Sequence, residues 1–166
     1  MENLFVQKVG NYNIRRCNKE DLKHVISINL TTLPEHYSDY FFEDLHRSTP
    51  ESFFVAEDKN GIVGYIMCRT EYGFSNFNRF SLSKKGHIVS LAILEEHRKK
   101  GLGKTLIKAA INGLKIRECG EVYLEVRVSN EEAVKLYLQL NFKITSVENG
   151  YYRDNEKANI MSIKLI

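Results

Sequence analysis

One stretch of the chain, Gly86–Lys104, constrains the fold more than any other because its character changes twice along its length. It reads GHIVSLAILEEHRKKGLGK. His87–Ile93 is a short apolar run with β-branched residues, which predicts a buried strand. Leu94–Lys100 is polar and charged, so the chain is expected to leave the sheet there. Beyond it, apolar residues recur at the spacing of a helix, at Leu102, Leu106, Ile107, Ala110, Ile111 and Leu114.

The predicted start of this helix combines backbone and side chains that suit a phosphate group. Two glycines and three cations lie within Arg98–Gly103. Glycine lets the backbone approach a ligand closely, and a helix N-terminus presents unpaired N–H groups and a partial positive charge. The alternative is a basic helix cap after an ordinary buried strand. The segment predicts a pyrophosphate site formed by Arg98, Lys99, Lys100, Gly101, Leu102, Gly103 and Lys104.

The remaining segments predict further strands. Glu121–Val128 follows the central helix, so this strand–helix–strand unit should be parallel with a right-handed crossover. Asn60-Gly61 predicts a hairpin. Tyr72–Lys85 is expected to be a long polar loop that either borders a substrate groove or is anchored by its aromatic residues. Other strands are predicted at Tyr12–Cys17, Ser52–Glu57, Ile62–Thr70, Phe142–Val147 and Ala158–Leu165.

Capping residues predict three more helices. Asn18 precedes one whose buried stripe is Leu22, Val25, Ile26 and Leu30. Ser38 begins a second helix that runs to about Arg47. Ser129 and Glu132 suit a capping box for the last helix, with Ala133, Leu136, Tyr137 and Leu140 on one face. We therefore predict an α/β fold in one domain, residues 12–166, with a mixed central sheet and helices on both faces. Met1–Asn11 is expected to form a short N-terminal tail.

Composition excludes several classes of protein. No apolar run is long enough to span a membrane, and the first residues lack the pattern of a signal peptide. The net charge of +3 is not concentrated in one tract, so no nucleic-acid partner is expected. Cys17, Cys68 and Cys119 are far apart and have no metal-ligand spacing. We therefore expect reduced thiols, a cytoplasmic protein, and neither a metal site nor a membrane partner.

The segment Arg98–Gly103 has the form Arg-x-x-Gly-x-Gly, which resembles the acetyl-CoA motif of GNAT-fold acetyltransferases. The later segments Tyr123–Asn130, Ala133, Leu136-Tyr137 and Asn141-Phe142 are also similar to that family. Three segments resemble its NatA-type branch, which acetylates protein N-termini, and especially the archaeal members: Leu33-Pro34-Glu35, Gly86-His87 and Gly150-Tyr151-Tyr152. The chain is also similar to bacterial ribosomal-protein alanine acetyltransferases, and the resemblance extends from about Tyr12 to Ile166.

This resemblance implies a GNAT domain that transfers acetyl from acetyl-CoA to the free amine of a protein N-terminus and releases CoA. It also implies a ribosome or an auxiliary subunit as a partner. Two alternatives stay open: a lysine or small-amine acetyltransferase on the same fold, and a non-catalytic acyl-CoA-binding module. An attacking amine must be neutral, which costs roughly 1 kcal/mol at pH 7 for an α-amine and roughly 4.6 kcal/mol for lysine. A weak base therefore suffices for an N-terminus.

The predicted base is the pair His87 and Glu125, on the two strands that flank the central helix. Histidine titrates near neutrality, so it can accept a proton. Burial of a carboxylate in an apolar strand is unfavourable, so its presence there indicates a specific role. The resemblance implies that both remove a proton through water. The alternatives are a bond from His87 to loop backbone, and a solvated face for Glu125 or a salt bridge to Arg127 or Arg69.

The remaining predicted site residues follow from the resemblance. Tyr137 is expected near the thioester sulfur, with core packing as its alternative. Asn130 is expected to bind the pantetheine arm, with an ordinary N-cap as its alternative. Leu91, Ala92 and Ile93 are expected to pair with pantetheine through their backbone. Substrate binding is expected at Glu35, Tyr37 and Tyr152, whose alternatives are a solvated loop acid and half-exposed packing.

Overall fold

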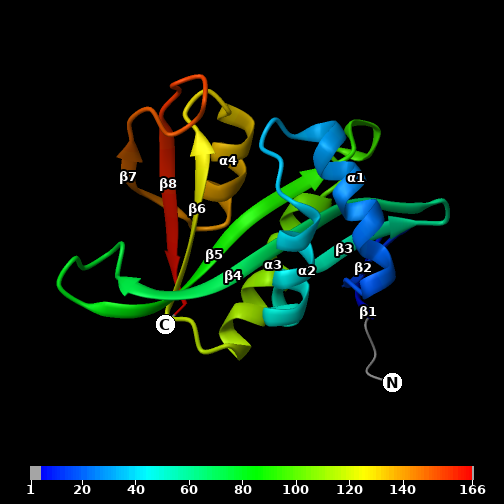
Figure 1. Cartoon of the computed structure of the whole chain (residues 1–166), viewed down its shortest axis with the longest axis horizontal. Coiled ribbons are helices and arrows are strands. Elements are labelled where there is room, and N and C mark those ends of the chain that lie inside the picture. Colours follow the sequence, from blue (N-terminus) through cyan, green and yellow to red (C-terminus); the bar gives the residue numbers. More distant parts are fainter. Residues whose placement is uncertain (1–4, 166) are drawn as a thin grey trace. The chain divides into compact units, whose positions relative to one another are not determined.

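Eight strands form one mixed sheet in the order β1-β2-β3-β4-β5-β6-β8-β7 (Figure 1). The structure is a computed structural model that describes residues 5–165. Strand β5 pairs with β6 in parallel, whereas β1 with β2, β2 with β3, β3 with β4, β6 with β8 and β7 with β8 are antiparallel. The strands are β1 Phe5–Val9, β2 Tyr12–Arg16, β3 Phe54–Asp58, β4 Gly61–Phe74, β5 Leu82–Ile93, β6 Glu121–Arg127, β7 Lys143–Glu148 and β8 Ala158–Lys164.

The described residues form two compact units. Unit 1 runs to Arg69 and includes Ile88–Arg117, and unit 2 is Thr70–His87 with the chain from Glu118 on. Strands β4 and β5 contribute residues to both. Unit 1 holds the helices α1 Leu22–Thr32, α2 Asp39–Ser48 and α3 Leu102–Ile116, with 3-10 turns at Lys19–Asp21, Pro50–Ser52 and Glu95–His97. Unit 2 holds α4 Glu131–Gln139.

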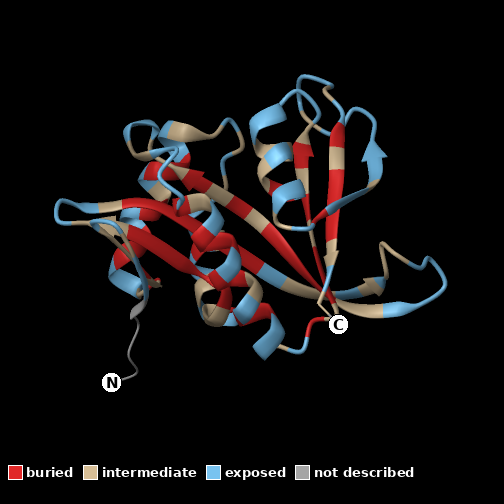
Figure 2. Ribbon diagram, turned by 180° about the vertical axis from the view of Figure 1, so that it is seen from behind, coloured by how far each residue is buried: buried red, intermediate tan, exposed pale blue. Residues whose placement is uncertain are grey.

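Alternation along the strands of unit 1 divides its apolar residues between the two faces of the sheet. Val55, Tyr65 and Met67 belong to the core that includes buried residues of α1 and α2. Their neighbours Phe54 and Ile66 are equally buried and face the other side, where α3 packs against β3. The two views show α1 and α2 on one face and α3 on the other (Figures 1 and 2). Helices therefore cover both faces of unit 1, as predicted.

A glycine in α3 allows this helix to pack closely against a turn in unit 1. A Cβ atom on Gly113 would lie 1.8 Å from the carbonyl oxygen of Glu51, so no other residue fits there without a shift of the backbone. Glu51 belongs to the 3-10 turn Pro50–Ser52 that follows α2. The helix that begins at the predicted phosphate site is thereby fixed against the end of α2.

In unit 2, strand β6 separates apolar from polar residues by alternation. Val122, Leu124 and Val126 are buried, with at most 6% exposure. The alternate positions carry the polar side chains of Glu121, Tyr123, Glu125 and Arg127 on the opposite face. Unit 2 therefore presents a polar sheet face, and the catalytic pair predicted from sequence lies on it.

Several sequence-based expectations are confirmed. Strands β5 and β6 are parallel, and α3 lies between them in the sequence, as predicted. Asn18 caps a turn before α1, through a capping box with Asp21. Ser38 caps α2 by accepting a hydrogen bond from the N–H of Phe41. The Asn60-Gly61 hairpin joins β3 to β4. Among residues 5–165, no helix is both long enough and apolar enough to cross a membrane.

Other expectations are corrected. Tyr72–Lys85 is not one long loop, because β4 continues to Phe74 and β5 begins at Leu82. The backbone of Ser75 bonds that of Ser81 and closes the short connection. In this hairpin most of the apolar residues are exposed, so no buried strand pattern marks it: Tyr72 is 81% exposed and Leu82 is 76% exposed.

The expected N-terminal tail also differs in its described part. Phe5–Val9 form β1, which pairs with β2 and extends the sheet edge; residues 1–4 and 166 lie outside the described part. In α1, Leu30 is 54% exposed, because the buried stripe turns instead through Ile28 and Asn29. The last helix is capped by Asn130 rather than by a Ser129–Glu132 box.

Candidate functional site

The predicted catalytic pair meets on the polar face of unit 2. His87 is the last residue of β5 that pairs with β6, opposite Tyr123, and Glu125 lies two residues farther along β6 on the same face. The Nε2 atom of His87 lies 2.7 Å from Oε2 of Glu125. Their side chains are 8% and 15% exposed, respectively. A short hydrogen bond in a largely buried setting orients the imidazole toward the carboxylate.

Tyr123, which the sequence analysis did not single out, fixes the plane of the imidazole ring. Its ring stacks on His87 with centroids 4.5 Å apart and planes 8° apart. The hydroxyl of Tyr123 donates to the carboxylate of Glu71. The ammonium of Lys85 lies over the ring of Tyr123, 4.7 Å from the ring centroid. The histidine is therefore held from two directions, by the carboxylate at its edge and by the aromatic ring at its face.

Lys85 and Glu121 anchor this face at its other end. Lys85 is 8% exposed and donates to the carbonyl of Phe74 and to Oδ1 of Asn76, at 2.9 and 2.8 Å. Glu121 is 3% exposed and accepts from the backbone N–H of Asn76 at 2.8 Å. Both buried charges are thus hydrogen-bonded to the connection between β4 and β5, which ties that hairpin to the strand that carries Glu125.

Arg127 organises the neighbouring segment that contains the predicted substrate residue Tyr152. It pairs with Asp154 at 2.8 Å and with Glu156 at 3.1 Å. Its guanidinium lies 4.0 Å from the ring centroid of Tyr152, and Tyr151 packs edge-to-face on the same ring. Tyr152 is therefore a half-buried side chain held by packing, in agreement with the alternative considered for it from sequence.

Asn130 and Tyr137 lie on α4 as expected. The Oδ1 atom of Asn130 accepts from the N–H of Ala133 at 3.2 Å, so this residue is the N-cap of the helix. Tyr137 is 8% exposed, and its ring packs edge-to-face against Phe142 with centroids 5.7 Å apart. Both residues thus have a structural role beside the one predicted for them.

The predicted phosphate site in unit 1 has the backbone geometry that a helix start requires. Gly101 precedes α3 with a left-handed φ of 81°, and a Cβ atom there would meet nothing within 4 Å. Leu102 is buried, so only its backbone can contact a ligand. Lys99, Lys100 and Lys104 are exposed. The first N–H groups of α3 and these ammonium groups fit the phosphates of a nucleotide-containing ligand.

Residues Leu91–Ile93 lie at the end of β5. Among the described residues, the pairing of β5 with β6 covers only Lys85–His87, although β5 continues to Ile93. Ala92 is buried in the core of unit 1. The carbonyl of Ile93 accepts a hydrogen bond from Nε of Arg98 at 2.9 Å. Arg98 is therefore tied to the end of the strand, which the sequence analysis did not anticipate.

The two predicted substrate residues of unit 1 lie between α1 and α2. The backbone carbonyl of Glu35 accepts a hydrogen bond from Nδ2 of Asn29 at 3.2 Å. The hydroxyl of Tyr37 donates to the carbonyl of Val89 at 3.4 Å, and its ring stacks on Phe41. The segment is therefore attached both to α1 and to β5.

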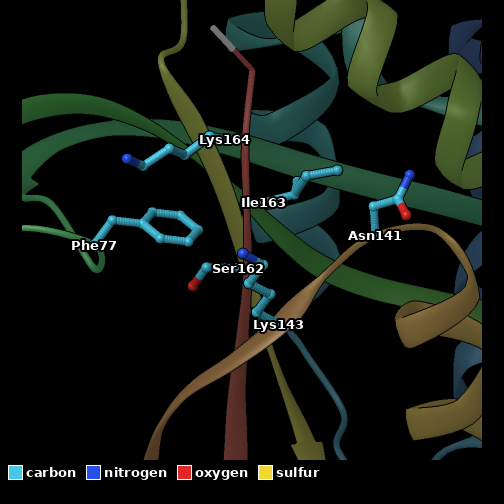
Figure 3. A pocket seen from close by; sticks show the side chains of 6 residues that line it. All are labelled: Phe77, Asn141, Lys143, Ser162, Ile163 and Lys164. Carbon is cyan, nitrogen blue, oxygen red and sulfur yellow. The ribbon is translucent and has the colours of Figure 1, made fainter.

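A surface pocket of about 390 Å³ lies in unit 2 (Figure 3). Phe77 and Lys164 lie on one side of β8, with the ammonium of Lys164 5.2 Å from the ring centroid of Phe77. None of the predicted site residues lines it. Its described lining consists of Phe77, Asn141, Lys143, Ser162, Ile163 and Lys164.

Sequence reasoning found His87 and Glu125 but missed the residues that hold them. A signal for Tyr123 was present, because Glu121, Tyr123, Glu125 and Arg127 alternate with apolar residues along one strand. No comparable signal marks Glu71 or Lys85, whose partners become clear only when β4, β5 and β6 are aligned. In chemical terms, the arrangement offers a buried imidazole–carboxylate pair in unit 2 and a cationic helix start in unit 1.

The chain matches the profile of the acetyltransferase (GNAT) family over residues 22–142. It is 46% identical over 157 residues to an N-alpha-acetyltransferase of Saccharolobus solfataricus, covering 93% of this chain and 94% of that protein. It is 40% identical over 148 residues to the N-terminal acetyltransferase A complex catalytic subunit NAA10 of Arabidopsis thaliana, covering 87% of this chain and 73% of that protein.

Among solved structures, Ard1 from Thermoplasma volcanium superimposes with a TM-score of 0.79 at 30% identity, covering 94% of this chain and 99% of that chain. The extent of these matches, the α/β fold and the Arg-x-x-Gly-x-Gly helix start agree with one another. The chain belongs to the acetyltransferase (GNAT) family.

Proposed function

We propose that this chain is a protein N-terminal α-acetyltransferase, which transfers acetyl from acetyl-CoA to the free α-amine of a protein. The observation that carries the proposal is the 2.7 Å contact between His87 and Glu125 on the polar face of unit 2. Relatives that match nearly the full length of the chain bear the name N-alpha-acetyltransferase, which supports the choice of substrate.

The chemistry of the amine favours an N-terminus over a lysine side chain. An α-amine has a pKa of roughly 7.7–8.0, whereas that of lysine is about 10.4. An imidazole and a carboxylate form a weak base, which suffices for the first but not readily for the second. In the proposal, His87 and Glu125 act as one unit that takes a proton from the attacking amine through a water molecule.

In unit 1, two segments are assigned to acetyl-CoA. The helix start Arg98–Lys104 would hold the phosphates, through its exposed lysines and the first N–H groups of α3. Leu91–Ile93 would bind the pantetheine arm by backbone. Among the residues of unit 2, Asn130 is assigned to pantetheine from the family resemblance alone. Acetyl-CoA supplies the thioester, and Tyr137 is assigned to stabilise the leaving thiolate.

Substrate recognition is assigned to Glu35, Tyr37 and Tyr152. A carboxylate at position 35 favours a small polar first residue over a bulky one. Glu35→Ala removes this carboxylate. It should lower kcat/KM for peptides that begin with Ser and leave kcat/KM unchanged or higher for peptides that begin with Met. Equal losses for both peptides would show that Glu35 positions the amine or the loop instead.

An auxiliary subunit or the ribosome is the proposed macromolecular partner. The Arabidopsis relative is named a catalytic subunit of a complex, and a structure of 25% identity is a NatB acetyltransferase complex bound to CoA. A cytoplasmic location completes the proposal. All three cysteines are buried thiols, which is compatible with a reducing compartment.

The experiment that tests the function is a comparison of three peptides of the same sequence. All three contain an internal lysine. The first has a free α-amine and a blocked lysine, the second has a blocked α-amine and a free lysine, and the third has both groups free. CoA release and peptide mass are measured with acetyl-CoA present. The proposal expects acetylation only where the α-amine is free. Acetylation of the blocked peptide at lysine would favour the lysine acetyltransferase alternative, and no turnover with any peptide would favour a binding module.

A further inference from the structure

A buried polar cluster in unit 1 has no role in the proposed chemistry. Asn29 on α1, Tyr65 on β4 and Ser90 on β5 are 1%, 0% and 6% exposed. On α1, the other buried positions are the apolar residues Leu22, Val25 and Ile28. An apolar side chain at position 29 would continue that stripe, so a polar one there needs an explanation.

Asn29 is the donor in two hydrogen bonds of this cluster. Nδ2 of Asn29 donates to the carbonyl of Glu35 at 3.2 Å and to the hydroxyl of Tyr65 at 3.1 Å. The oxygen of Tyr65 lies 2.6 Å from Oγ of Ser90. Because that oxygen accepts from Asn29, its own proton is available to Ser90. Burial raises the pKa of Tyr65 to about 12, so the hydroxyl keeps this proton at neutral pH.

The cluster therefore links the predicted substrate segment to the sheet. Both protons of the Asn29 amide are used, one on the backbone of Glu35 and one on Tyr65. Within the described residues, Oδ1 of Asn29 is buried and has no hydrogen-bond partner. Tyr37 adds a second attachment, through its hydroxyl, to the carbonyl of Val89.

We propose that Asn29, held in place by Tyr65 and Ser90, is a positioning residue that fixes the backbone of Glu35 and thereby sets the preference for the first residue of the substrate. This inference rests on the proposed function, in which Glu35 contacts the peptide. Asn29 acts through Glu35 and does not itself contact the peptide or acetyl-CoA. Loss of the link should therefore reduce selectivity more than it reduces turnover.

The test compares Tyr65→Phe and Asn29→Ala with Thr49→Val. Tyr65→Phe removes the hydroxyl and keeps the buried ring, so the link can still be tested with this variant if Asn29→Ala does not fold. Thr49 is a matched control, because this residue of unit 1 is 2% exposed and its hydroxyl donates to the carbonyls of Leu45 and Cys68. The measured quantities are kcat/KM for Ser-starting and Met-starting peptides, acetyl-CoA affinity, and hydrogen exchange at residues 33–37.

Both link variants should lower the Ser-to-Met ratio by about two- to tenfold, the range that corresponds to one buried hydrogen bond. Exchange at residues 33–37 should accelerate, and acetyl-CoA affinity and the Thr49→Val ratio should stay as in the wild type. In a Glu35→Ala background, Tyr65→Phe should produce no further change in the ratio, because its effect passes through Glu35.

An unchanged ratio in folded Tyr65→Phe and Asn29→Ala, or an equal change in Thr49→Val, would overturn the inference. Additive effects with Glu35→Ala would also overturn it. The hydrogen-exchange measurement separates this failure from failure of the proposed function. If exchange is faster but the enzyme acetylates no peptide N-terminus, the proposed function is wrong and the link from Asn29 to Glu35 still stands. If exchange is unchanged, the link itself is wrong.

Discussion

Units 1 and 2 bury their polar groups in different ways. In unit 1 the most buried polar cluster is neutral, with Asn29, Tyr65 and Ser90 joined by hydrogen bonds, and the cations at the start of α3 are exposed. In unit 2 the polar face of β6 collects charged and titratable side chains that are largely buried, including Lys85, His87 and Glu121. In the proposed function, the buried groups of unit 1 fix geometry and the His87–Glu125 pair of unit 2 accepts the proton.

This difference separates two kinds of functional effect. Neutral hydrogen bonds fix geometry without changing protonation, so changes in unit 1 should alter affinity and selectivity. Buried charges have strong electrostatic interactions in a low-dielectric setting, so changes near His87 should alter turnover. The predictions below test that division, from the largest expected effect to the smallest.

The largest effect is expected for the imidazole–carboxylate pair. His87→Ala or Glu125→Gln should each lower kcat by about 10²–10⁴-fold, the usual contribution of general base catalysis. Acetyl-CoA affinity should change little, because neither residue is assigned to the phosphates or the pantetheine arm. Steady-state kinetics with calorimetry would measure both quantities. Glu148→Gln, at an exposed position at the end of β7, is the control. Wild-type turnover in either variant would end the assignment of the base.

The second effect concerns acetyl-CoA binding at the start of α3. Gly103→Leu should weaken the affinity by about tenfold or more through loss of close backbone approach, without the strain of a left-handed residue. Gly101→Ala adds that strain, because its φ is 81°. Gly10→Ala is its matched control, with a φ of 55° and nothing within 4 Å of the added Cβ. If both Gly103→Leu and Gly101→Ala keep the wild-type affinity in calorimetry with CoA, this helix start does not bind the phosphates.

A smaller effect is expected for the ring beneath the histidine. Tyr123→Leu removes the stacked ring and should lower kcat by roughly tenfold, since misplacement of a catalytic group is costly. Tyr123→Phe keeps the ring and should restore most of the turnover, although its bond to Glu71 is lost. Neither change should affect acetyl-CoA affinity. Equal turnover in the two variants would show that stacking does not position His87.

The smallest effect is expected for a buried carboxylate that belongs to unit 1. Burial alone would raise the pKa of Asp21, but hydrogen bonds from Arg15 and the Asn18 backbone outweigh it, so the pKa lies below its ordinary value. Asp21→Asn should lower the free energy of unfolding by about 1–3 kcal/mol near neutral pH and leave kcat unchanged. Asp44→Asn, in an exposed pair with Arg47, should cost less.

The pH dependence has a definite sign. A carboxyl whose pKa is lowered by folding stabilises the native state above the ordinary pKa of about 3.9, and this contribution disappears as the pH falls through the folded value. The difference between wild type and Asp21→Asn in denaturant unfolding should therefore shrink on acidification. A constant difference down to the acid limit would contradict this account of Asp21.

The sequence predicted those parts of the fold that depend on local patterns. The apolar run at His87–Ile93, the helical spacing from Leu102 and the capping residues Asn18 and Ser38 each act within a few residues, and each is confirmed. The hairpin beyond Thr70 escaped prediction because its exposed aromatic residues do not form a buried pattern. Strand β1 escaped because Phe5–Val9 is defined by its pairing with β2.

The candidate site was predictable to a similar degree. His87 and Glu125 were chosen because adjacent parallel strands could bring them together and because the resemblance to the NatA-type branch implies that both take part in proton removal. Tyr123, Lys85 and Asn29 were not found, since their roles depend on which side chains face them across strands. Arg98 was expected to face a phosphate, and its bond to the carbonyl of Ile93 depends on a loop conformation that spacing alone does not determine.

The most direct test of the central claim is a double-mutant cycle on His87 and Glu125, with kcat measured on a Ser-starting peptide at saturating acetyl-CoA. If the two side chains act as one base, the double variant His87→Ala with Glu125→Gln should lose no more turnover than the more damaged single variant. Acetyl-CoA affinity should be the same in all four proteins. Losses that multiply in the double variant would show independent roles and would contradict the claim that this pair forms one proton-accepting unit.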